Sequence, residues 1–470
     1  MVCDAVSGGV KSIMMKKLSA VLLFGAVLVT ASAFAAGEAR TMFLGDSITH
    51  LGFCEYYLQL FENLRHPGSG VRYYNAGFGG GTLQTGIANC KQEIERVRPS
   101  RVVVMFGMND IGWTAFETNE VIRAERKAVA DKSLSAYREG YRRLLSEIRG
   151  LGVTNIVLAT PTPYDEYSWA SPAVKRRNVN EYGLKGMANI VRETAREGSL
   201  LCVDLNAPMT EMAARHPEIA WCGGDRVHPG RLGYLFMAMQ YLAAFGEMRP
   251  VASVTLTADG KIASCENAKV DGVAKSADGL SFVYRPQALP FPSLPEYEQL
   301  KSLDPKVRKL NCETLAVKGL QEGTWRLSAD GRELGTFTAR QFADGVNLAE
   351  LDTPNRRIAA KAAEAMTALR DFDQPRRDRA CVRRKYESFG VPMNDKKALK
   401  DAVDKYLAKL KAEKYPWYDW EEGAAGKFLD AIGRDEEIQA EEERRYRAMA
   451  DVRPVAVRIE IRKVVSKELP

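Results

Sequence analysis

The sequence predicts an α/β fold for its first half, with a parallel sheet covered by helices on both faces. Three observations support this class: short apolar runs alternate with longer helical stretches, the alternation continues from residue 40 to about residue 247, and polar or glycine-rich turns follow the runs. We expect strands at 41–45, 71–75, 101–106, 153–160 and 200–204, and helices near 51–64, 84–97, 133–149, 174–197 and 230–245. In such sheets the ligand site lies beyond the carboxyl ends of the strands.

The first expected strand ends abruptly in the turn Gly45-Asp46-Ser47. A serine in this position has its side chain at the end of a buried strand and its N–H near the start of the next helix. Helix starts offer free backbone donors and a positive partial charge. Ser47 is therefore a candidate nucleophile. Most Gly-Asp-Ser triplets are ordinary turns, so the function depends on a base and an oxyanion site elsewhere in the chain.

Two further turns contain candidate hydrogen-bond donors. The second strand leads into a segment with four glycines among residues 77–81. Such a segment lets the backbone approach a ligand closely and point N–H groups at it; the alternative is a flexible turn. The spacing of a phosphate-binding loop is absent. The third strand is followed by Asn109, whose amide can donate to a developing oxyanion or cap a helix.

The candidate base is His228, one of four histidines in the chain. Asp225 precedes it by three positions, so the carboxylate can lie on the same side of a turn, accept the Nδ1 proton and leave Nε2 free. Pro229 suits the first position of the following helix. The alternative for Asp225 and His228 is a surface salt link. His50 and His216 have no carboxylate three positions before them, and we expect them to be structural.

Gly-Asp-Ser, Asn-x-Gly-x-x-Gly-x-Thr, Gly-x-Asn-Asp and Asp-x-x-His follow one another at expected strand ends of one α/β unit. This set resembles the SGNH hydrolase family, also called GDSL-type esterases, over roughly residues 40–247. The resemblance implies a flavodoxin-like three-layer α/β/α domain at 38–248. It also implies that Ser47 is the nucleophile, that Asp225 and His228 complete a catalytic triad, and that Gly80 and Asn109 form the oxyanion hole with the Ser47 N–H.

The activity implied by this resemblance is ester hydrolysis through an acyl-serine, without metal or organic cofactor. We expect activity to fall below about pH 6–7, where a histidine base takes up a proton. O-deacetylation of a small-molecule or carbohydrate ester is favoured. The alternatives are a lipase, phospholipase or thioesterase, and an inactive surface or carbohydrate-binding protein.

The N-terminal 35 residues are predicted to be a signal peptide. The true start is Met14 or Met15, the apolar core spans 18–29, and cleavage is expected near Ala35. The alternative is an uncleaved anchor, but the apolar run is short for a membrane span. We therefore expect a periplasmic or extracellular protein without stable membrane insertion after cleavage.

Composition excludes some classes of partner. The net charge is +7, but basic residues are not grouped with aromatic ones, so we expect no nucleic-acid partner. Of eight cysteines, seven remain after signal cleavage, and Cys265 with Cys312 is a candidate disulfide in an oxidising compartment.

Two further regions follow the α/β domain. Short alternating runs and Asp-Gly turns predict a small antiparallel β-sandwich at 250–350, with a proline-rich loop at 286–295. Residues 353–470 are predicted to be helical and to end in a strand near 455–461 that returns to pair with the β domain. The expected helices are 355–372, 378–389, 396–413 and 422–449.

Overall fold

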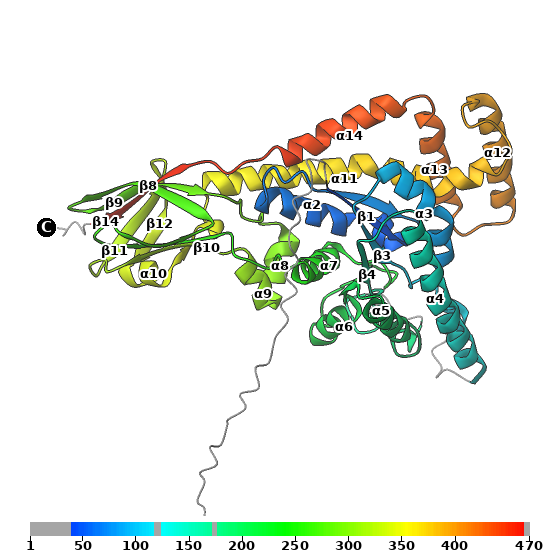
Figure 1. The fold of residues 1–470 in the computed structure, drawn as a ribbon. Helices are drawn as coiled ribbons and strands as arrows, with labels where there is room; N and C mark the ends of the chain where they lie inside the picture. Colours follow the sequence, from blue (N-terminus) through cyan, green and yellow to red (C-terminus); the bar gives the residue numbers. More distant parts are fainter. Residues whose placement is uncertain (1–38, 117–123, 172–175, 465–470) are drawn as a thin grey trace, which may run out of the picture. The chain divides into compact units, whose positions relative to one another are not determined.

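A five-stranded parallel sheet in the order β2-β1-β3-β4-β5 forms the centre of the first half of the chain. The computed structural model describes residues 39–116, 124–171 and 176–464, so the expected signal peptide lies outside the described residues. The strands are β1 (Arg40–Gly45), β2 (Arg72–Gly77), β3 (Arg101–Met105), β4 (Ile156–Ala159) and β5 (Leu201–Val203). The strand order and the layers confirm the predicted three-layer α/β/α fold (Figure 1).

Helices cover both faces of this sheet. α2 and α7 pack on each other on one face, while α3, α4 and α5 pack side by side on the other. The helices of this region are α1 (Ser47–His50), α2 (Phe53–Arg65), α3 (Leu83–Val97), α4 (Ala124–Gly150), α5 (Lys185–Glu197), α6 (Asn206–Arg215) and α7 (Arg231–Ala244). The helix expected at 51–64 begins only at Phe53, because Gly52 has φ of 76° and separates α1 from α2.

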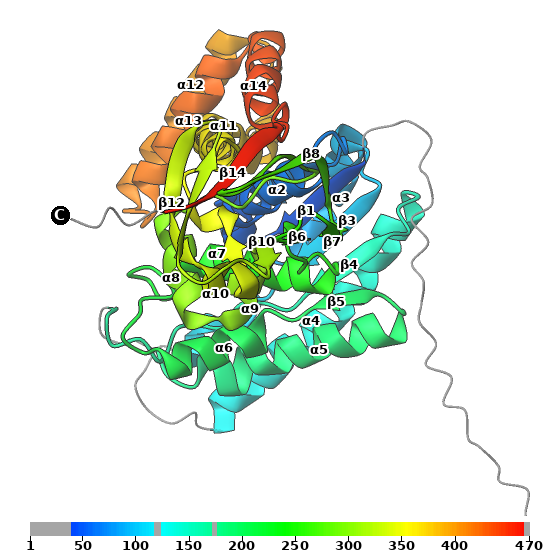
Figure 2. The same cartoon turned by 90° about the vertical axis from the view of Figure 1, so that its left-hand side faces the viewer.

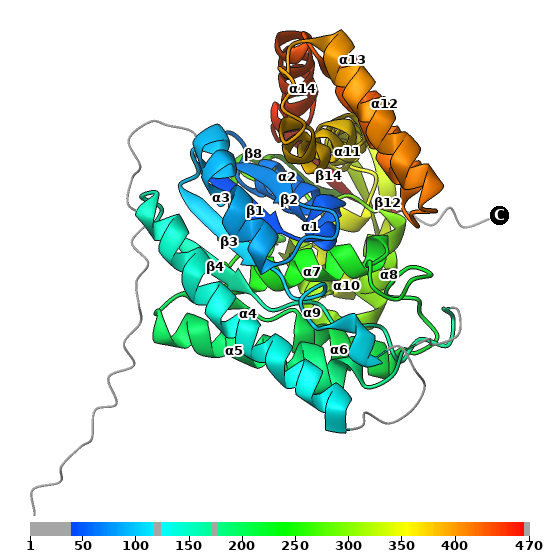
Figure 3. The ribbon, with the colours of Figure 1, turned by 90° about the vertical axis from the view of Figure 1, so that its right-hand side faces the viewer.

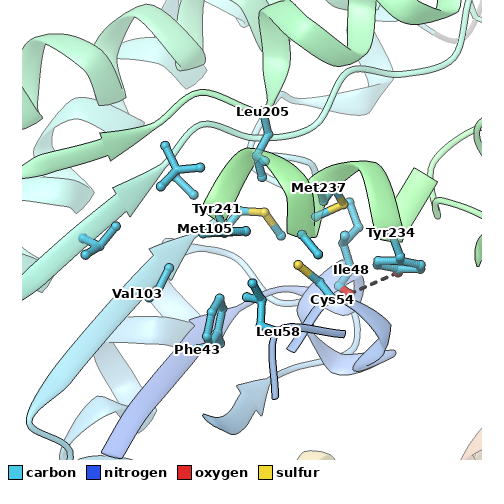
Figure 4. Close-up of a cluster of buried hydrophobic side chains, with 14 of the residues drawn as sticks. Phe43, Ile48, Cys54, Leu58, Val103, Met105, Leu205, Tyr234, Met237 and Tyr241 are labelled. Atoms are coloured by element: carbon cyan, nitrogen blue, oxygen red, sulfur yellow. Dashed lines mark hydrogen bonds between the residues drawn. The ribbon is translucent and has the colours of Figure 1, made fainter. Parts of the chain in front are cut away.

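The apolar faces of these elements form one buried core. Figure 4 shows side chains from β1, β3, α2 and α7 gathered around Ile48 of α1. The Tyr234 hydroxyl of α7 donates a hydrogen bond to the Ile48 carbonyl at 3.1 Å, so α7 is tied directly to α1. This core therefore fixes the position of the segment that follows the first strand.

The second region contains two β-sheets around a separate core (Figure 2). One has the order β13-β10-β6-β7 and the other β12-β11-β14-β9-β8. The strands are β6 (Ala252–Thr257), β7 (Ile262–Glu266), β8 (Ala268–Ser276), β9 (Gly279–Pro286), β10 (Glu313–Lys318), β11 (Thr324–Ala329), β12 (Arg332–Thr338), β13 (Val346–Asn347) and β14 (Val457–Lys463). Each of the three Asp-Gly turns joins a hairpin, and the strand pairs of this region are antiparallel as predicted except for β6 with β10, which pair in parallel.

Strand β14 confirms that the end of the chain returns to the β region. It lies between β9 and β11 and pairs with both in antiparallel register. Its residues Val457, Ile459 and Ile461 are buried and alternate with more exposed ones, as the sequence pattern predicted.

Two short helices, α8 (Pro295–Leu303) and α9 (Pro305–Leu310), were not predicted. Both begin at a proline, which is favourable at the first position of a helix. Their buried residues belong to the same core as the parallel sheet, and α8 contacts α7.

The C-terminal helices group around one long helix, α11 (Pro354–Glu387), which packs against α2 (Figures 1 and 3). The other helices of this group are α12 (Lys396–Ala412), α13 (Tyr418–Ala431) and α14 (Asp435–Ala450). Two predicted helices are thus one continuous helix through Pro375, and the helix predicted at 422–449 is two, α13 and α14. Among the described helices, none is both long and apolar enough to cross a bilayer.

Candidate active site

Ser47 is the first residue of α1, directly after β1. The preceding Asp46 caps this helix, because its carboxylate accepts the Ile48 N–H at 2.9 Å. Gly45 has no room for a side chain: an added Cβ would lie 2.6 Å from the Met105 carbonyl oxygen. The residue types of this turn therefore hold the serine at the carboxyl edge of the sheet.

Asp46 is almost fully buried. Burial raises the pKa of its carboxyl to about 7, although the hydrogen bond from the Ile48 N–H opposes the shift. The carboxyl faces the charge of Asp110, which raises its pKa further, and that of His228, which lowers it. The sequence pattern indicates Asp46 only as part of a turn, so this buried acid beside the serine was not predicted.

Residues 77–81, here called the glycine loop, begin with the last residue of β2. Gly77 packs against α1 so closely that an added Cβ would lie 2.2 Å from the His50 backbone nitrogen. Gly80 has φ of 66°, a conformation that disfavours side chains. Among the described residues, the backbone N–H groups of Ser47 and Gly80 have no hydrogen-bond acceptor. Both donors are thus available to a ligand.

The turn after β3 is tied to the glycine loop and to the helix that follows it. Asn109 Nδ2 donates to the Gly81 carbonyl at 2.9 Å. The adjacent Asp110 accepts the Leu83 N–H of α3 at 3.1 Å, and burial raises the pKa of its carboxyl to about 6. The structure therefore brings the second and third sequence motifs into contact.

Asp225 and His228 lie in one tight turn before α7. The Asp225 carboxylate accepts the His228 N–H at 3.0 Å, and its second oxygen is 2.5 Å from His228 Nδ1. Pro229 was predicted to be the first residue of the helix, and this prediction was wrong. Pro229 pairs with Cys222 in an isolated β-bridge, and Gly230 precedes the helix at Arg231.

The Nε2 atom of His228 is 2.7 Å from Ser47 Oγ. Asp225, His228 and Ser47 thus form a continuous hydrogen-bond chain from carboxylate through imidazole to hydroxyl. Burial raises the pKa of Asp225, but the hydrogen bonds from the His228 side chain and from backbone N–H groups outweigh it and lower the pKa to about 2. An ionised Asp225 favours the tautomer with the proton on Nδ1, which leaves Nε2 to accept the serine proton.

Arg226 lies between Asp225 and His228 in the sequence, and no sequence pattern indicated its role. Its buried guanidinium donates to the backbone carbonyls of Asp165 at 2.7 Å, Ser168 at 2.9 Å and Ser171 at 3.1 Å. The arginine therefore fixes the segment after β4 beside the histidine turn. Its φ of 64° is a rare conformation for a residue with a side chain, and it marks a backbone held by its surroundings.

The structure also places the remaining histidines and the candidate disulfide. His50 Nε2 is 3.0 Å from Asp378 of α11, a carboxylate 328 positions away that no local spacing indicates. The disulfide predicted between Cys265 and Cys312 was wrong, because these two residues are not bonded to each other and all seven cysteines of the described residues are free. His216 has an exposed partner, Glu218, at 3.2 Å. Within the described part of the chain, no group of three or more His, Cys, Asp or Glu side chains could hold a metal ion.

Residues 43–235 match the GDSL-like lipase/acylhydrolase family, and this range contains every residue of the hydrogen-bond chain. The chain contains a GDSL-type domain. It is accordingly a hydrolase of ester bonds.

Two relatives extend this comparison. The acetylxylan esterase of Geobacillus stearothermophilus is 28% identical over 225 residues, which cover 44% of this chain and 94% of the relative. The solved structure of a gut microbial diltiazem-metabolizing enzyme superposes with a TM-score of 0.78 at 26% identity, covering 91% of this chain and 98% of the other. The first relative thus spans the GDSL-type domain, while the second also shares the β region and the C-terminal helices.

Proposed function

We propose that this GDSL-type domain is a serine esterase that works through an acyl-serine intermediate. His228 removes the proton of Ser47 as the hydroxyl attacks the ester carbonyl, and Asp225 orients the imidazole. The Ser47 and Gly80 N–H groups and the Asn109 amide then stabilise the tetrahedral oxyanion. His228 donates the proton to the departing alcohol, and a water molecule that it activates releases the acid.

The observation that carries this proposal is the 2.7 Å contact between His228 Nε2 and Ser47 Oγ. Its direct test is covalent labelling by a fluorophosphonate probe, which reacts with activated serines. The wild type should be labelled, and Ser47→Ala should not. Labelling of Ser47→Ala at the wild-type rate would show that another residue reacts and would end the proposal, while an unlabelled wild type would favour an inactive binding protein.

We propose that the substrate is an O-acetylated carbohydrate. One support is the acetylxylan esterase relative. Another is a pair of exposed tryptophans: Trp417 and Trp420 are 67% and 38% exposed, and Trp420 is close to the glycine loop, since a Cβ added to Gly79 would lie 3.9 Å from its Cζ2. Exposed aromatic rings present a flat apolar face with a polar edge, which suits the apolar face of a sugar ring. A cavity of about 280 Å³ adjoins the loop and is lined by Phe78, Gly79, Thr85, Asn89, Ala380, Cys381 and Lys385.

Hydrolysis of esters of graded acyl length separates this substrate class from the alternatives. An acetylesterase should act faster on acetyl than on octanoyl esters, and on acetylated xylan or acetylated sugars as well as on simple acetates. Faster hydrolysis of octanoyl esters would instead indicate a lipase, phospholipase or thioesterase. Diltiazem is a further test compound, because the relative that matches across both accessory regions metabolises it.

We also propose that the protein is exported and acts in the periplasm or outside the cell. The support is the basic, apolar and small-residue pattern of the first 35 residues. Fractionation of expressing cells and N-terminal sequencing of the mature protein test it. An N-terminus near Ala36 in the exported fraction is expected, and a full-length cytoplasmic protein would contradict it.

A further inference from the structure

The outer side of the glycine loop is attached to helix α11, a C-terminal element outside the GDSL-type domain. The Gly79 N–H donates to Cys381 Sγ at 3.4 Å, and the two residues are 302 positions apart. Gly79 directly precedes Gly80, whose N–H is a proposed oxyanion donor. A residue of the last third of the chain therefore holds the peptide next to that donor.

His50 forms a second attachment of the same loop. It is the last residue of α1, three positions after Ser47, and it is 5% exposed. Its Nδ1 is 3.4 Å from the Gly77 carbonyl and 3.6 Å from Cys381 Sγ, while its Nε2 is 3.0 Å from Asp378 Oδ1. One imidazole thus bridges the start of the glycine loop to two residues of α11.

The Asp378 carboxylate is itself held in place. It is 3% exposed and accepts hydrogen bonds from Gln374 Nε2 at 3.0 Å and from Lys427 Nζ of α13 at 2.5 Å. These bonds and the bond with His50 outweigh burial and lower the pKa of Asp378, which therefore stays ionised.

The proton on His50 strengthens this bridge. Burial lowers its pKa, but the hydrogen bonds with Asp378 and Cys381 outweigh burial and raise the pKa to about 9. An imidazolium donates from both ring nitrogens. At neutral pH, Nε2 can therefore donate to Asp378 while Nδ1 donates to the Gly77 carbonyl of the glycine loop. The charged or titratable groups that act directly on His50 are Asp378, Cys381 and Arg377 of α11 and Glu55 of α2. Lys427 of α13 acts on it through Asp378.

We propose that α11 positions the oxyanion donors of the GDSL-type domain through the residues His50, Asp378 and Cys381. They are positioning residues: none lies in the Ser47–His228–Asp225 chain, and each acts through the glycine loop. The inference rests on the proposed serine mechanism. It goes beyond that mechanism because it assigns the C-terminal helices a role in positioning the active site. A donor aimed at the transition-state oxygen loses its effect when displaced by a fraction of an ångström, because the charge it meets is localised.

The first test compares kcat and KM on a 4-nitrophenyl acetate substrate for Cys381→Ala and Cys381→Ser. Alanine removes the acceptor of the Gly79 N–H, and serine keeps one. We expect Cys381→Ala to lower kcat about tenfold with KM changed less than about twofold, and Cys381→Ser to recover most of the loss. Equal kcat in the wild type and both variants would overturn the role of Cys381.

The second test uses Asp378→Asn, with Tyr56→Phe as the matched control. Tyr56 donates to Asp373 of α11 at 2.9 Å, so its variant weakens the same helix interface without touching the glycine loop. We expect Asp378→Asn to lower kcat about tenfold and Tyr56→Phe less than about twofold. Equal losses in the two variants would show that the interface only supports folding, and would overturn the proposal.

The pH profile gives a readout that a merely structural role would not change. Loss of the His50 proton should weaken the bridge, so kcat of the wild type should fall above about pH 9. Removing the carboxylate in Asp378→Asn lowers the pKa of His50, so the alkaline decline should begin at lower pH. An alkaline limb at the same pH in both proteins would contradict the bridge.

Hydrogen exchange separates failure of this inference from failure of the serine mechanism. In the catalytically silent Ser47→Ala background, Cys381→Ala should increase amide exchange in residues 77–81 about tenfold, while exchange in α4 stays unchanged. This result depends only on the attachment of the loop. Unchanged exchange would exclude the attachment even if Ser47 is the nucleophile. Increased exchange, combined with a wild type that a fluorophosphonate does not label, would support the attachment and contradict only the serine mechanism.

Discussion

His228 Nε2 lies 2.7 Å from Ser47 Oγ although 181 positions separate the two residues. The serine begins α1, and the histidine lies just before α7. These segments are held together because Tyr234 of α7 donates to the Ile48 carbonyl of α1 at 3.1 Å. The geometry of the pair is therefore set by the packing of two helices rather than by a flexible loop.

Asp225→Asn should leave this geometry in place but abolish the correct histidine tautomer. We expect kcat to fall on the order of 10⁴-fold, as when the orienting carboxylate of comparable triads is replaced. The measurement is the rate of 4-nitrophenyl acetate hydrolysis by protein whose Tm is within a few degrees of the wild type. Glu218→Gln is the control, because the exposed Glu218 pairs with the half-buried His216; its kcat should not change.

Asn109→Ala should lower kcat about 10²–10³-fold with little change in KM, because one of the proposed oxyanion donors is lost. Asn109→Asp fills the same space, but its carboxylate cannot donate a hydrogen bond and adds a negative charge. Its kcat should therefore be no higher than that of Asn109→Ala. Since Asn109 also bonds the Gly81 carbonyl, the Tm of both variants must be compared. An Asn109→Asp enzyme with near wild-type kcat would exclude the amide from the oxyanion site.

Arg226→Lys should be damaging although the charge is kept. A lysine cannot span the three backbone carbonyls that the guanidinium bonds, so buried acceptors lose their donors. We expect a loss of about 3 kcal/mol in the free energy of unfolding, measured by urea denaturation, and a lower kcat because the histidine turn loosens. Arg192→Lys is the matched control, since Arg192 bonds Asp204 in a half-exposed pair; it should cost less than about 1 kcal/mol.

The buried Asp46 predicts a specific pH dependence of stability. Its pKa is about 7 in the folded protein against an ordinary value of 3.8, so the folded state binds the proton more tightly. This contribution to stability is fully present below about pH 4 and is lost as pH rises through about 7. From about pH 5 to about pH 8, the Tm of the wild type should therefore fall relative to that of Asp46→Asn, which does not titrate. The exposed Asp131→Asn should instead follow the wild type across this range.

Strand β14 should be essential to the β region. Ile461 is fully buried in the sheet β12-β11-β14-β9-β8. Ile461→Ala should therefore reduce the free energy of unfolding by about 2–5 kcal/mol. Arg458→Ala, at an exposed position of the same strand, is the control and should change it by less than about 0.5 kcal/mol. Denaturant titration followed by tryptophan fluorescence, to which Trp325 of this core contributes, measures both. Equal stability of the two variants would contradict the assigned register.

The parallel sheet was predictable because its evidence is local. Each strand is a short apolar run, and the residues that matter lie within a few positions of a strand end, as Ser47 does after β1. Asp225 and His228 were paired from their three-residue spacing alone, and the structure brings them within 2.5 Å. Sequence patterns of this range reflect backbone periodicity and turn chemistry, which act over short distances.

The contacts of α11 could not be predicted, because they depend on partners hundreds of positions apart. Nothing near His50 in the sequence indicates Asp378, and nothing near Gly79 indicates Cys381. The parallel pairing of β6 with β10 was missed for the same reason: β6 begins a hairpin with β7, and its parallel partner β10 follows only after β8, β9, α8 and α9. Tertiary packing also keeps α11 helical across Pro375, where local preference alone predicts a break.

The position of β14 has a consequence for how the chain folds during synthesis. Because this strand occupies the middle of its sheet, between β9 and β11, the earlier strands are left with two unpaired edges until residues 457–463 have been made. Exposed edges of this kind invite pairing with other chains. A truncated or stalled product ending before β14 should therefore be prone to aggregation.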